Sequence, residues 1–577
     1  MKRPLTITFL ALMTWSLASA GSPKIAKDLE NRDPNSTVDV IVQFHQAPAE
    51  RHHQMIRGKG GIHKSDLQVV KAAAYSVPAS ALAQLADDPD VAYISPDRLV
   101  KGALDYANPT VGADIALKYG YDGTGVAIAV IDSGMQDRPE FQSVPNAKGK
   151  TTSRLLYSQN FVSTGTTADA YGHGTHVAGI LAGNGQRSSN NQAYRTFVGI
   201  ASNVNLVNLR VLDKNGVGTD SGVIAAIQTA IALKSQYNIR VINLSLGRPV
   251  YESYQQDPLC QAVEQAWKAG IVVVAAAGNE GRNNTLGTNG YGTITAPGND
   301  PYAITVGAMK TMGTVARGDD LVASYSSKGP ALIDHFVKPD LVAPGNRIIS
   351  FIKQASTLYN SSNSLNLVPC SYYTTACTGT STTYYRLSGT SMATPMVSGA
   401  AALMLQKDPT LTPDQVKARL MKTAAKNFPA SSIATDPTTG LSYTSQYDIF
   451  TVGAGYLDVW GALNNSDLAA GSALSPTAAY DAATGNVYVV NSQSDPAGAT
   501  AVWGTTAVWG TTAVWGTSVF VGGANALWGS NALWGSNALW GSSSVAGFNA
   551  LWGSNALWGT SAAPATEAAT LLITGEN

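Results

Sequence analysis

Between residues 126 and 306, short apolar runs alternate with longer stretches whose apolar residues recur at helical spacing. The apolar runs that indicate strands are 126–132, 206–212, 241–246, 271–277 and 303–306. Strands that are apolar at nearly every position are buried on both faces of a sheet. The stretches between them include predicted helices over 221–234 and 262–268. This alternation predicts an α/β fold of three layers, in which helices cover both faces of a parallel sheet.

Two more helices are predicted beyond the last of these strands. Thr412 and Gln415 supply an N-cap and its capping-box partner for a helix over 413–424. Small residues after Ser391 indicate another helix that runs on through Ala402, and Pro395 would fit its first turn. These two helices complete the predicted core.

A smaller unit precedes the predicted sheet. Residues 38–44 and 91–94 have the pattern of strands, and a helix-forming stretch with Leu82 and Leu85 lies between them. This pattern predicts a small α+β domain over residues 21–101. Its last five residues, 97–101, form a polar join that a protease could cleave.

The first 20 residues have the layout of a cleavable signal peptide. Lys2 and Arg3 precede an apolar run over 5–17, which small residues at 18–20 follow. A buried core helix is the alternative, but a charged start, a short apolar stretch and an Ala-Ser-Ala ending together favour export. No later apolar run reaches the roughly 18–20 residues needed to cross a bilayer. We therefore expect a protein that acts outside the cell without a transmembrane anchor.

Charge and cysteine content bear on the protein's partners and on its disulfide bonds. Lys and Arg total 38, as do Asp and Glu, so no charge imbalance indicates nucleic acid as a partner. Of the three cysteines, Cys370 and Cys377 could form a disulfide outside the cell, which would leave Cys260 as a buried free thiol. The six residues between the first two permit this pairing without requiring it.

The C-terminal part of the chain is repetitive. After a predicted linker over 466–500, six-residue units of the types Ala-Val-Trp-Gly-Thr-Thr and Asn-Ala-Leu-Trp-Gly-Ser recur through 501–560, before a tail over 561–577. An even period places every Trp on one face of an extended chain. A stacked β structure or adhesive strip and a low-complexity tail without a fixed fold remain equal alternatives. We expect the repeats to contact the cell envelope, and a chain that ends near residue 470 to keep its activity and melting temperature.

Three polar residues lie at strand ends or helix starts, positions that favour catalytic or binding side chains. Asp132 ends an apolar strand, and open α/β sheets bind ligands at the carboxyl ends of their strands. His173 lies among glycines that let a helix start close to other backbone, while a structural role is the simpler explanation for His176. Ser391 precedes a helix whose dipole favours negative charge near the hydroxyl, although capping alone would explain a serine there.

Taken together, these segments resemble those of the subtilisin-like serine proteases. Val-Ile-Asp-Ser-Gly around Asp132, Gly-His-Gly-Thr-His-Val-Ala-Gly around His173 and Gly-Thr-Ser-Met-Ala-Thr-Pro around Ser391 occur in that family's order and at similar spacings. The resemblance predicts a peptidase domain over 102–465. It implies that the serine attacks the peptide carbonyl to form an acyl-enzyme, that the histidine acts as general base and that the aspartate fixes the imidazole. Such chemistry requires no cofactor.

The resemblance also assigns supporting residues. Asn279, which follows a buried strand, would donate to the oxyanion beside the backbone N–H of Ser391, although an ordinary turn asparagine is the alternative. The residues predicted to bind an extended peptide are Gly216, Val217, Gly218, Ser245, Leu246, Gly247, Ala277, Gly278 and Thr295. Thr295 falls where many relatives have glycine at the base of the primary specificity pocket. We therefore expect a pocket that favours medium apolar side chains over aromatic ones.

Partners and metals follow from the same resemblance. It implies protein or peptide substrates, and it implies that residues 21–101 form an inhibitory pro-domain. A structural calcium ion stays open, because Glu140 stands near a ligand position of relatives whereas residues 183–197 do not match their tight calcium loop. No Asp-rich loop or His-Glu-x-x-His motif offers another metal site.

Two other functions are open at this point. A catalytically inactive relative would bind peptides without cleaving them, but the triad and Asn279 are chemically competent. Alternatively, the repeats would make the protein an adhesin or surface-layer component, and the peptidase domain would serve only its maturation.

Overall fold

The computed structural model describes most of the chain up to residue 490. The described residues are 22–490 and residue 576, with gaps at 27–28, 30–31, 69–70, 97–103, 137, 144–149, 164, 190–191, 286, 361–365, 437–438, 470 and 482–485. The predicted signal peptide and the repeats over 501–560 therefore lie outside the described residues. The chain divides into two compact units, 1–101 and 102–577, and each is described by itself.

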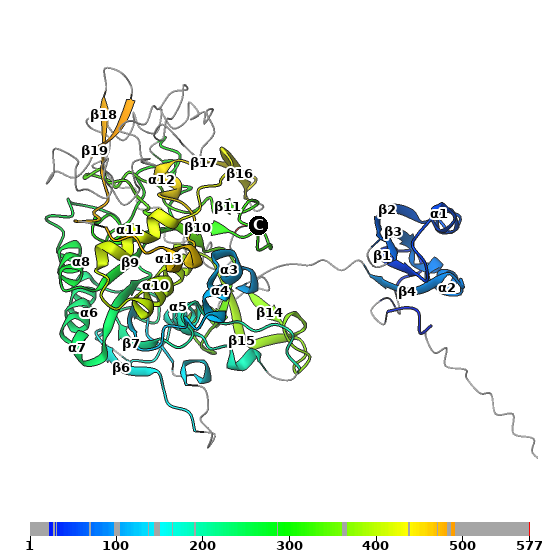
Figure 1. Cartoon of the computed structure of the whole chain (residues 1–577), viewed down its shortest axis with the longest axis horizontal. Helices are drawn as coiled ribbons and strands as arrows, with labels where there is room; N and C mark the ends of the chain where they lie inside the picture. The colour runs from blue at the N-terminus through cyan, green and yellow to red at the C-terminus, as the bar shows by residue number, and fades with distance from the viewer. Residues whose placement is uncertain are drawn as a thin grey trace, which may run out of the picture. The chain divides into compact units, whose positions relative to one another are not determined.

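The N-terminal unit is a four-stranded antiparallel sheet with two helices (Figure 1). Its elements are β1 (Thr37–Phe44), α1 (Glu50–Arg57), β2 (Ile62–Leu67), β3 (Ala72–Pro78), α2 (Leu82–Ala86) and β4 (Val91–Pro96), and the strand order is β2-β3-β1-β4. The predicted strands and the helix around Leu82 are confirmed as β1, β4 and α2. Two strands and α1 were missed, because β2 is largely exposed and polar while β3 begins with three alanines.

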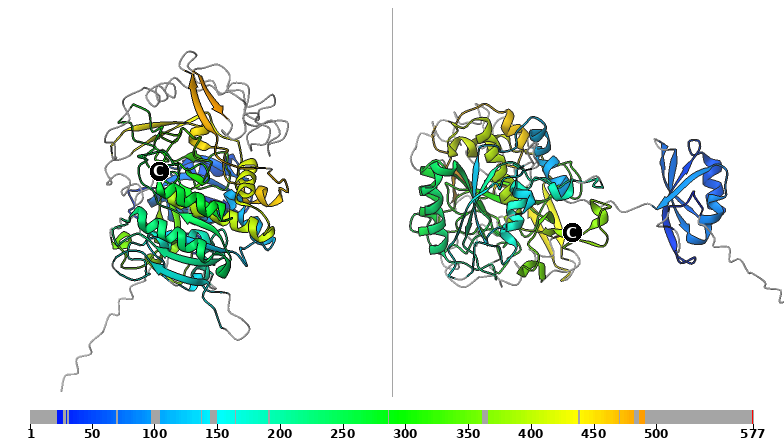
Figure 2. Two further views of the ribbon diagram at one scale, coloured as in Figure 1. Left: turned by 90° about the vertical axis from the view of Figure 1, so that its left-hand side faces the viewer. Right: turned by 90° about the horizontal axis from the view of Figure 1, so that it is seen from below.

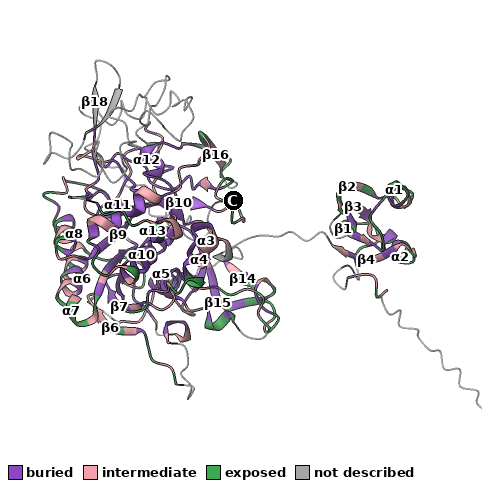
Figure 3. Ribbon diagram, in the orientation of Figure 1, coloured by how far each residue is buried: buried purple, intermediate pink, exposed green. Residues whose placement is uncertain are grey.

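The C-terminal unit is built on an eight-stranded sheet, whose strands follow the order β11-β10-β9-β8-β5-β7-β6 with β12 also beside β10. The strands are β5 (Ala127–Asp132), β6 (Leu155–Asn160), β7 (Asn205–Arg210), β8 (Ile239–Leu244), β9 (Val272–Ala276), β10 (Ile304–Lys310), β11 (Leu321–Val322) and β12 (Leu341–Pro344). Every pairing is parallel except that of the two-residue edge strand β11. The sheet predicted to be wholly parallel is thus mixed at one edge. Its central strands are buried, as their continuous apolar runs predict (Figure 3).

Helices cover this sheet in two groups. The main helices are α5 (His173–Ala182), α6 (Asp220–Ala232), α8 (Pro258–Lys268), α10 (Thr390–Lys407), α11 (Pro413–Thr423) and α13 (Val459–Asn464). Helix α10 packs along β8, β9 and β10 together with α5, whereas α6 and α8 pack on each other and on β5, β8 and β9 (Figure 2). The predicted three-layer arrangement is confirmed for this unit. Among the described residues, no helix combines the length and the apolar character needed to span a bilayer.

Shorter elements complete the unit. They are α3 (Leu104–Val111), α4 (Ala113–Lys118), α7 (Lys234–Tyr237), β13 (Ile348–Phe351), α9 (Thr357–Asn360), β14 (Leu367–Pro369), β15 (Thr380–Leu387), β16 (Ser431–Thr435), β17 (Ser442–Gln446), α12 (Ile449–Val452), β18 (Thr477–Asp481) and β19 (Asn486–Val490). Strand β15 pairs with β13 and β14 in a separate small sheet.

Local signals in the sequence account for the ends of these helices. The capping box before α11 is confirmed, since the Thr412 hydroxyl accepts from the Gln415 N–H and the Gln415 side chain accepts from the Thr412 N–H. Helix α10 continues to Lys407, beyond its predicted end. The predicted disulfide between Cys370 and Cys377 is also confirmed, and Cys260 is a buried free thiol whose pKa is raised by burial.

The compact unit extends past its predicted end at residue 465. Ser475 is buried, and its hydroxyl donates to Asp340 Oδ1 at 2.6 Å and accepts from Lys417 Nζ at 2.9 Å. Thr477 also pairs with Phe336 in a β-bridge. The first part of the predicted linker therefore belongs to the fold, because it supplies a buried polar partner to charged core residues.

Glu576 lies in the same unit, where its carboxylate is buried among basic groups. It accepts from Lys310 Nζ at 3.0 Å and from the Ser324 N–H at 2.7 Å, and Arg282 lies 3.7 Å away. Its backbone N–H donates to Asn346 Oδ1 at 2.8 Å. No local pattern predicts these contacts, since they join residues more than 200 positions apart.

Candidate active site

Asp132 is the last residue of β5, a central strand that is buried along its whole length. Its carboxylate oxygen Oδ1 accepts hydrogen bonds from the Ser133 N–H at 2.7 Å and from His173 Nδ1 at 2.8 Å. The second oxygen, Oδ2, lies 3.0 Å from the same nitrogen. Because the chain leaves the sheet here, the carboxylate stands at the edge where parallel strands of α/β proteins meet ligands.

His173 is the first residue of α5, a helix that contacts β5. Gly172 precedes it with φ at +106°, a left-handed conformation that a residue with a side chain rarely adopts. Gly174 follows, and a Cβ there would collide with the carbonyl oxygen of Gly134. The glycines on either side of the histidine thus let the start of the helix approach the turn after Asp132 closely enough for the imidazole to reach the carboxylate.

The electrostatic surroundings of His173 favour its charged form. Burial by itself lowers the pKa of the imidazole, but the charge and hydrogen bond of Asp132, with a further contribution from the charge of Asp169, raise the pKa above its ordinary value. His176, one turn later, has no such partner. Burial lowers its pKa to about 3, and its Nε2 lies 3.1 Å from the Tyr385 carbonyl oxygen. This contrast fits the structural role predicted for His176.

Asp169, which was not predicted from the sequence, lies next to the Asp132–His173 pair. Its buried carboxylate accepts from the Ser133 hydroxyl at 2.8 Å, the Gly172 N–H at 2.6 Å and the Thr175 N–H at 2.8 Å. It therefore ties the turn after Asp132 to the first turn of α5. The only signal in the sequence is an acidic residue shortly before a helix start, where the dipole favours negative charge.

Ser391 is the second residue of α10, a helix that packs against α5. Its hydroxyl donates to the Ser245 carbonyl at 3.1 Å, and the Ser245 hydroxyl donates back to the Ser391 carbonyl at 2.9 Å. In the described part of the chain, the Ser391 hydroxyl thus bonds to Ser245 and not to His173. Catalytic hydrogen bonds often form only when substrate is present.

The return bond from Ser245 has a cause in the sequence. Pro395 lies four residues after Ser391, inside α10 and not in its first turn as predicted. Proline has no N–H, so the Ser391 carbonyl lacks its usual helical donor. The Ser245 hydroxyl takes the place of that donor, which fixes the end of β8 against the start of α10.

Asn279 follows β9 and reaches the same helix start. Its Oδ1 accepts from the Thr390 N–H at 2.9 Å and from the Thr390 hydroxyl at 3.1 Å. A Cβ added to Gly389 would lie 3.3 Å from Asn279 Nδ2. With Oδ1 held in this way, the amide N–H groups remain next to the backbone that precedes Ser391.

Comparison with known proteins identifies the family. A sequence model described as the Subtilase family matches residues 123–440. The chain is 35% identical to Serine protease AprX of Bacillus subtilis (strain 168) over 407 residues, which cover 67% of this chain and 82% of that protein. The chain belongs to the subtilase family. It is therefore a subtilisin-like serine peptidase that hydrolyses proteins.

Other relatives agree with this assignment. Subtilisin E of Bacillus subtilis (strain 168) is 34% identical over 391 residues, which cover 67% of this chain and 84% of that protein. An Extracellular serine proteinase of Thermus sp. (strain Rt41A) is 34% identical over 370 residues, with coverages of 62% and 72%.

Three predicted substrate-binding residues of this subtilase, Gly247, Gly278 and Thr295, lie next to one another. A Cβ added to Gly247 or to Gly278 would contact the side chain of Thr295, so these three residues face one another. The Thr295 hydroxyl also lies 3.3 Å from the Ala277 carbonyl, to which it donates. Leu246 packs partly buried against the core beside them. The side chain of Thr295 thus occupies volume that two neighbouring glycines leave open.

The second predicted substrate segment lies near His173. A Cβ added to Gly216 would collide with the ring of Tyr171, and the centroid of that ring is 6.3 Å from that of His173. Val217 is 64% exposed, which leaves it open to an incoming peptide. A Cβ added to Gly218 would collide with the carbonyl oxygen of Val211, the residue after the strand that ends at Arg210. Tyr171 was not predicted from the sequence, because its contact with Gly216 joins two separate loops.

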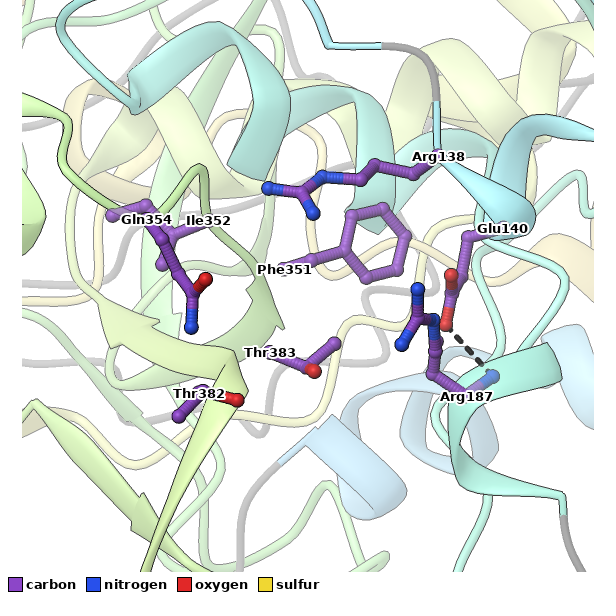
Figure 4. Close-up of a pocket in the computed structure, with 8 residues that line it drawn as sticks. All are labelled: Arg138, Glu140, Arg187, Phe351, Ile352, Gln354, Thr382 and Thr383. Carbon is purple, nitrogen blue, oxygen red and sulfur yellow. Dashed lines mark hydrogen bonds between the residues drawn. The ribbon is translucent and has the colours of Figure 1, made fainter.

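The surroundings of Glu140 do not suit a bound calcium ion, although the family resemblance left Glu140 open as a ligand. Glu140 Oε1 accepts from the Arg187 N–H at 2.8 Å and from the Tyr384 hydroxyl at 3.2 Å, and burial raises the pKa of the carboxyl. A cavity of about 190 Å³ lies beside it (Figure 4). Its lining residues are Arg138, Glu140, Arg187, Phe351, Ile352, Gln354, Thr382 and Thr383. Two guanidinium groups beside one carboxyl oppose a calcium ion, which prefers six to eight oxygen ligands.

A third guanidinium, that of Arg154, donates hydrogen bonds to backbone carbonyl oxygens of this region. Arg154 is buried, and it donates to the carbonyl oxygens of Val204 at 2.7 Å, Glu140 at 2.6 Å and Ala182 at 2.7 Å. Burial lowers its pKa to about 10, so it stays charged at neutral pH. A side-chain cation therefore holds together the end of α5 and the loops next to it.

Proposed function

We propose that this subtilase is a secreted endopeptidase in which Asp132, His173 and Ser391 form the catalytic triad. The observation that supports this most directly is the 2.8 Å hydrogen bond between His173 Nδ1 and Asp132 Oδ1 at the buried end of β5. When Nδ1 donates to the carboxylate, Nε2 is left as the acceptor, which is the tautomer that a general base requires. Asp169 would hold the two backbone segments that carry this pair in register.

The reaction would begin with movement of the Ser391 hydroxyl. In the proposed mechanism this hydroxyl leaves the Ser245 carbonyl and donates to His173 Nε2 as the substrate binds. Its oxygen then attacks the peptide carbonyl carbon while Nε2 takes the proton. The imidazolium returns this proton to the amine that leaves, and the C–N bond breaks to give an acyl-enzyme. Water releases the acyl group by the same steps, with His173 again as the base.

Two N–H donors are available for the oxyanion that forms in each step. The backbone N–H of Ser391 belongs to the first turn of α10, where helical N–H groups have no partner within the helix. The second donor is Asn279 Nδ2, since Oδ1 is already bonded to Thr390. Both donors lie at the positive end of the helix dipole, which favours negative charge.

The N-terminal unit would act as an inhibitor until it is removed. Its own hydrophobic core, which includes Val42, Tyr75 and Ile94, supports its folding as a separate domain. The polar join over 97–101 would be cleaved by the active site, after which protein or peptide substrates could enter. The Thermus relative is described as an extracellular proteinase, and this description and the predicted signal peptide support secretion. Contact of the repeats with the cell envelope stays part of the proposal.

A serine-directed fluorophosphonate tests the catalytic assignment. The full-length protein should be labelled at Ser391, as shown by mass spectrometry of its peptides, and Ser391→Ala should abolish both labelling and cleavage of casein. Ser398→Ala is a matched control, because Ser398 is buried in the same helix and bonds to Asn243 instead. Labelling at another serine, or cleavage by Ser391→Ala, would contradict the proposed triad. Failure of labelling in the folded wild type would favour the inactive-relative alternative.

A further inference from the structure

Two histidines and an aspartate converge on the surface of the N-terminal unit. His53 lies on α1, and His63 and Asp66 lie on β2, which packs against that helix (Figure 1). One ligand-type atom from each of the three side chains lies within 4.8 Å of the other two. His53 is buried, whereas the side chains of His63 and Asp66 are 28% and 40% exposed. The group is thus supported from the core and open to solvent on one side.

The two distances from Asp66 to the histidines lie near those of a tetrahedral metal site, and the two histidine nitrogens lie within 4.8 Å of each other. Asp66 Oδ1 lies 2.9 Å from His63 Nε2 and 3.5 Å from His53 Nε2. An ion with bonds of about 2.0–2.1 Å at tetrahedral angles holds its ligand atoms about 3.3 Å apart. The two observed separations lie on either side of this value. Shifts of a few tenths of an ångström in exposed side chains would bring both to it.

The other nitrogen of His53 has the partner that a metal-bound histidine needs. His53 Nδ1 lies 2.8 Å from the hydroxyl of Tyr75, a fully buried residue of β3. When Nδ1–H donates to this hydroxyl, the lone pair of Nε2 points toward Asp66. Metal-binding histidines commonly donate their second N–H to an oxygen in this way, which fixes the ring and its tautomer.

The ion-pair partners of Asp66 bear on whether the cluster would accept a cation. In the part of the chain that the structure describes, its ion-pair partners are His53 and His63, and no Lys or Arg pairs with it. A hydrogen-bonded cluster without metal is the simpler alternative. It requires at least one of the two imidazoles to point an N–H at the carboxylate, whereas a bound cation would satisfy all three groups at once.

We propose that His53, His63 and Asp66 bind a divalent transition-metal ion of the zinc type, with water as the fourth ligand. Imidazole and carboxylate together suit zinc, and three protein ligands with one open position form a known type of zinc site. The ion would stabilise the folded N-terminal unit, because it binds the assembled site and not the unfolded chain. This binding is independent of the inhibitory role proposed for the unit.

The proposal is tested by metal titration of the full chain. The Ser391→Ala protein, which avoids self-cleavage, is stripped with a chelator and titrated with zinc chloride by calorimetry. One ion should bind per chain in the unit of residues 22–96, and cobalt(II) in its place should give the intense visible bands of a tetrahedral site. His63→Gln and Asp66→Asn should each weaken zinc binding by more than about tenfold, and Tyr75→Phe by about 10–100-fold.

Matched variants separate this outcome from nonspecific binding. His45 is exposed in the same unit and lies outside the cluster, so His45→Gln should leave zinc affinity unchanged. Circular dichroism shows whether each variant is folded, and His63 and Asp66 are exposed enough for their variants to fold. No zinc binding by the wild-type sequence would overturn the proposal. Equal zinc affinity in the His63→Gln, Asp66→Asn and parent proteins would overturn it as well.

Discussion

Glu576 should stabilise the peptidase unit even though it is next to the end of the chain. Glu576 is 4% exposed, and its carboxylate faces Lys310 at 3.0 Å and Arg282 at 3.7 Å, residues that are 4% and 8% exposed. Glu576→Gln removes the negative charge and leaves both cations buried. Loss of one partner from a buried ion pair costs about 3–5 kcal/mol. Arg282 keeps a second carboxylate, Asp436 at 3.0 Å, so the lower end of that range, about 3 kcal/mol, is expected.

The corresponding change in melting temperature is measurable. A domain of 150–250 residues loses about 2–4 °C per kcal/mol and a larger one loses less, so we expect a decrease of about 3–6 °C. Differential scanning calorimetry on the Ser391→Ala background avoids self-digestion during the scan. Glu567→Gln is the control, since it removes the same charge from the same tail.

A double variant tests the cause of the effect. Lys310→Met removes the stranded cation, so Lys310→Met with Glu576→Gln should be more stable than Glu576→Gln alone. A melting temperature that Glu576→Gln leaves unchanged would refute the reasoning. The result also bears on truncation, because a chain that ends near residue 470 loses both Glu576 and Ser475. We therefore expect such a chain to melt at a lower temperature, contrary to the expectation from the sequence.

Four further predictions concern catalysis. Ser391→Ala should leave the precursor uncleaved, as seen by N-terminal sequencing, and cleavage of this purified variant at the usual junction would show that maturation is not autocatalytic. Asn279→Ala should lower kcat by about 100–1,000-fold with little change in KM, and a loss confined to KM would speak against an oxyanion role. The proposed base, His173, must be neutral to act, and its pKa is raised, so kcat/KM should fall as pH decreases through a value above the ordinary imidazole pKa of about 6.5. Asp169→Asn should move this limb to lower pH, and an unmoved limb in the folded variant would refute that coupling. Thr295→Gly should increase cleavage after Phe and Tyr relative to Leu in a peptide library, whereas a parent enzyme that already prefers aromatic residues would show that Thr295 does not narrow the pocket.

The sequence predicted the parts of the fold that depend on local patterns. The apolar run that ends at Asp132 and the capping box at Thr412 each determine a structure within a few residues, so both were predicted correctly. Strand β2 was missed because it is mostly polar and exposed, and such a strand has no apolar alternation to reveal it. The mixed edge of the sheet was missed because β11 has only two residues.

Prediction of the site followed the same division. Contiguous motifs predicted Asp132, His173 and Ser391 as the triad, and the structure brings the first two into hydrogen-bond contact. Asp169 and Tyr171 act through contacts with other loops, which no local pattern encodes. The bond from Ser245 to the Ser391 carbonyl needed both the position of Pro395 in the helix and the packing of β8 against it.

The buried guanidinium of Arg154 has a consequence for the conditions under which this enzyme can work. A bound ion can be diluted away or captured by a chelator, and its binding during folding is a second-order step. The positive charge of Arg154 is part of the chain. It therefore stays beside the carbonyl oxygens of Glu140, Ala182 and Val204 whatever ions the solution contains. This part of the protein should therefore fold by a first-order process and remain intact in fluids that are poor in divalent ions.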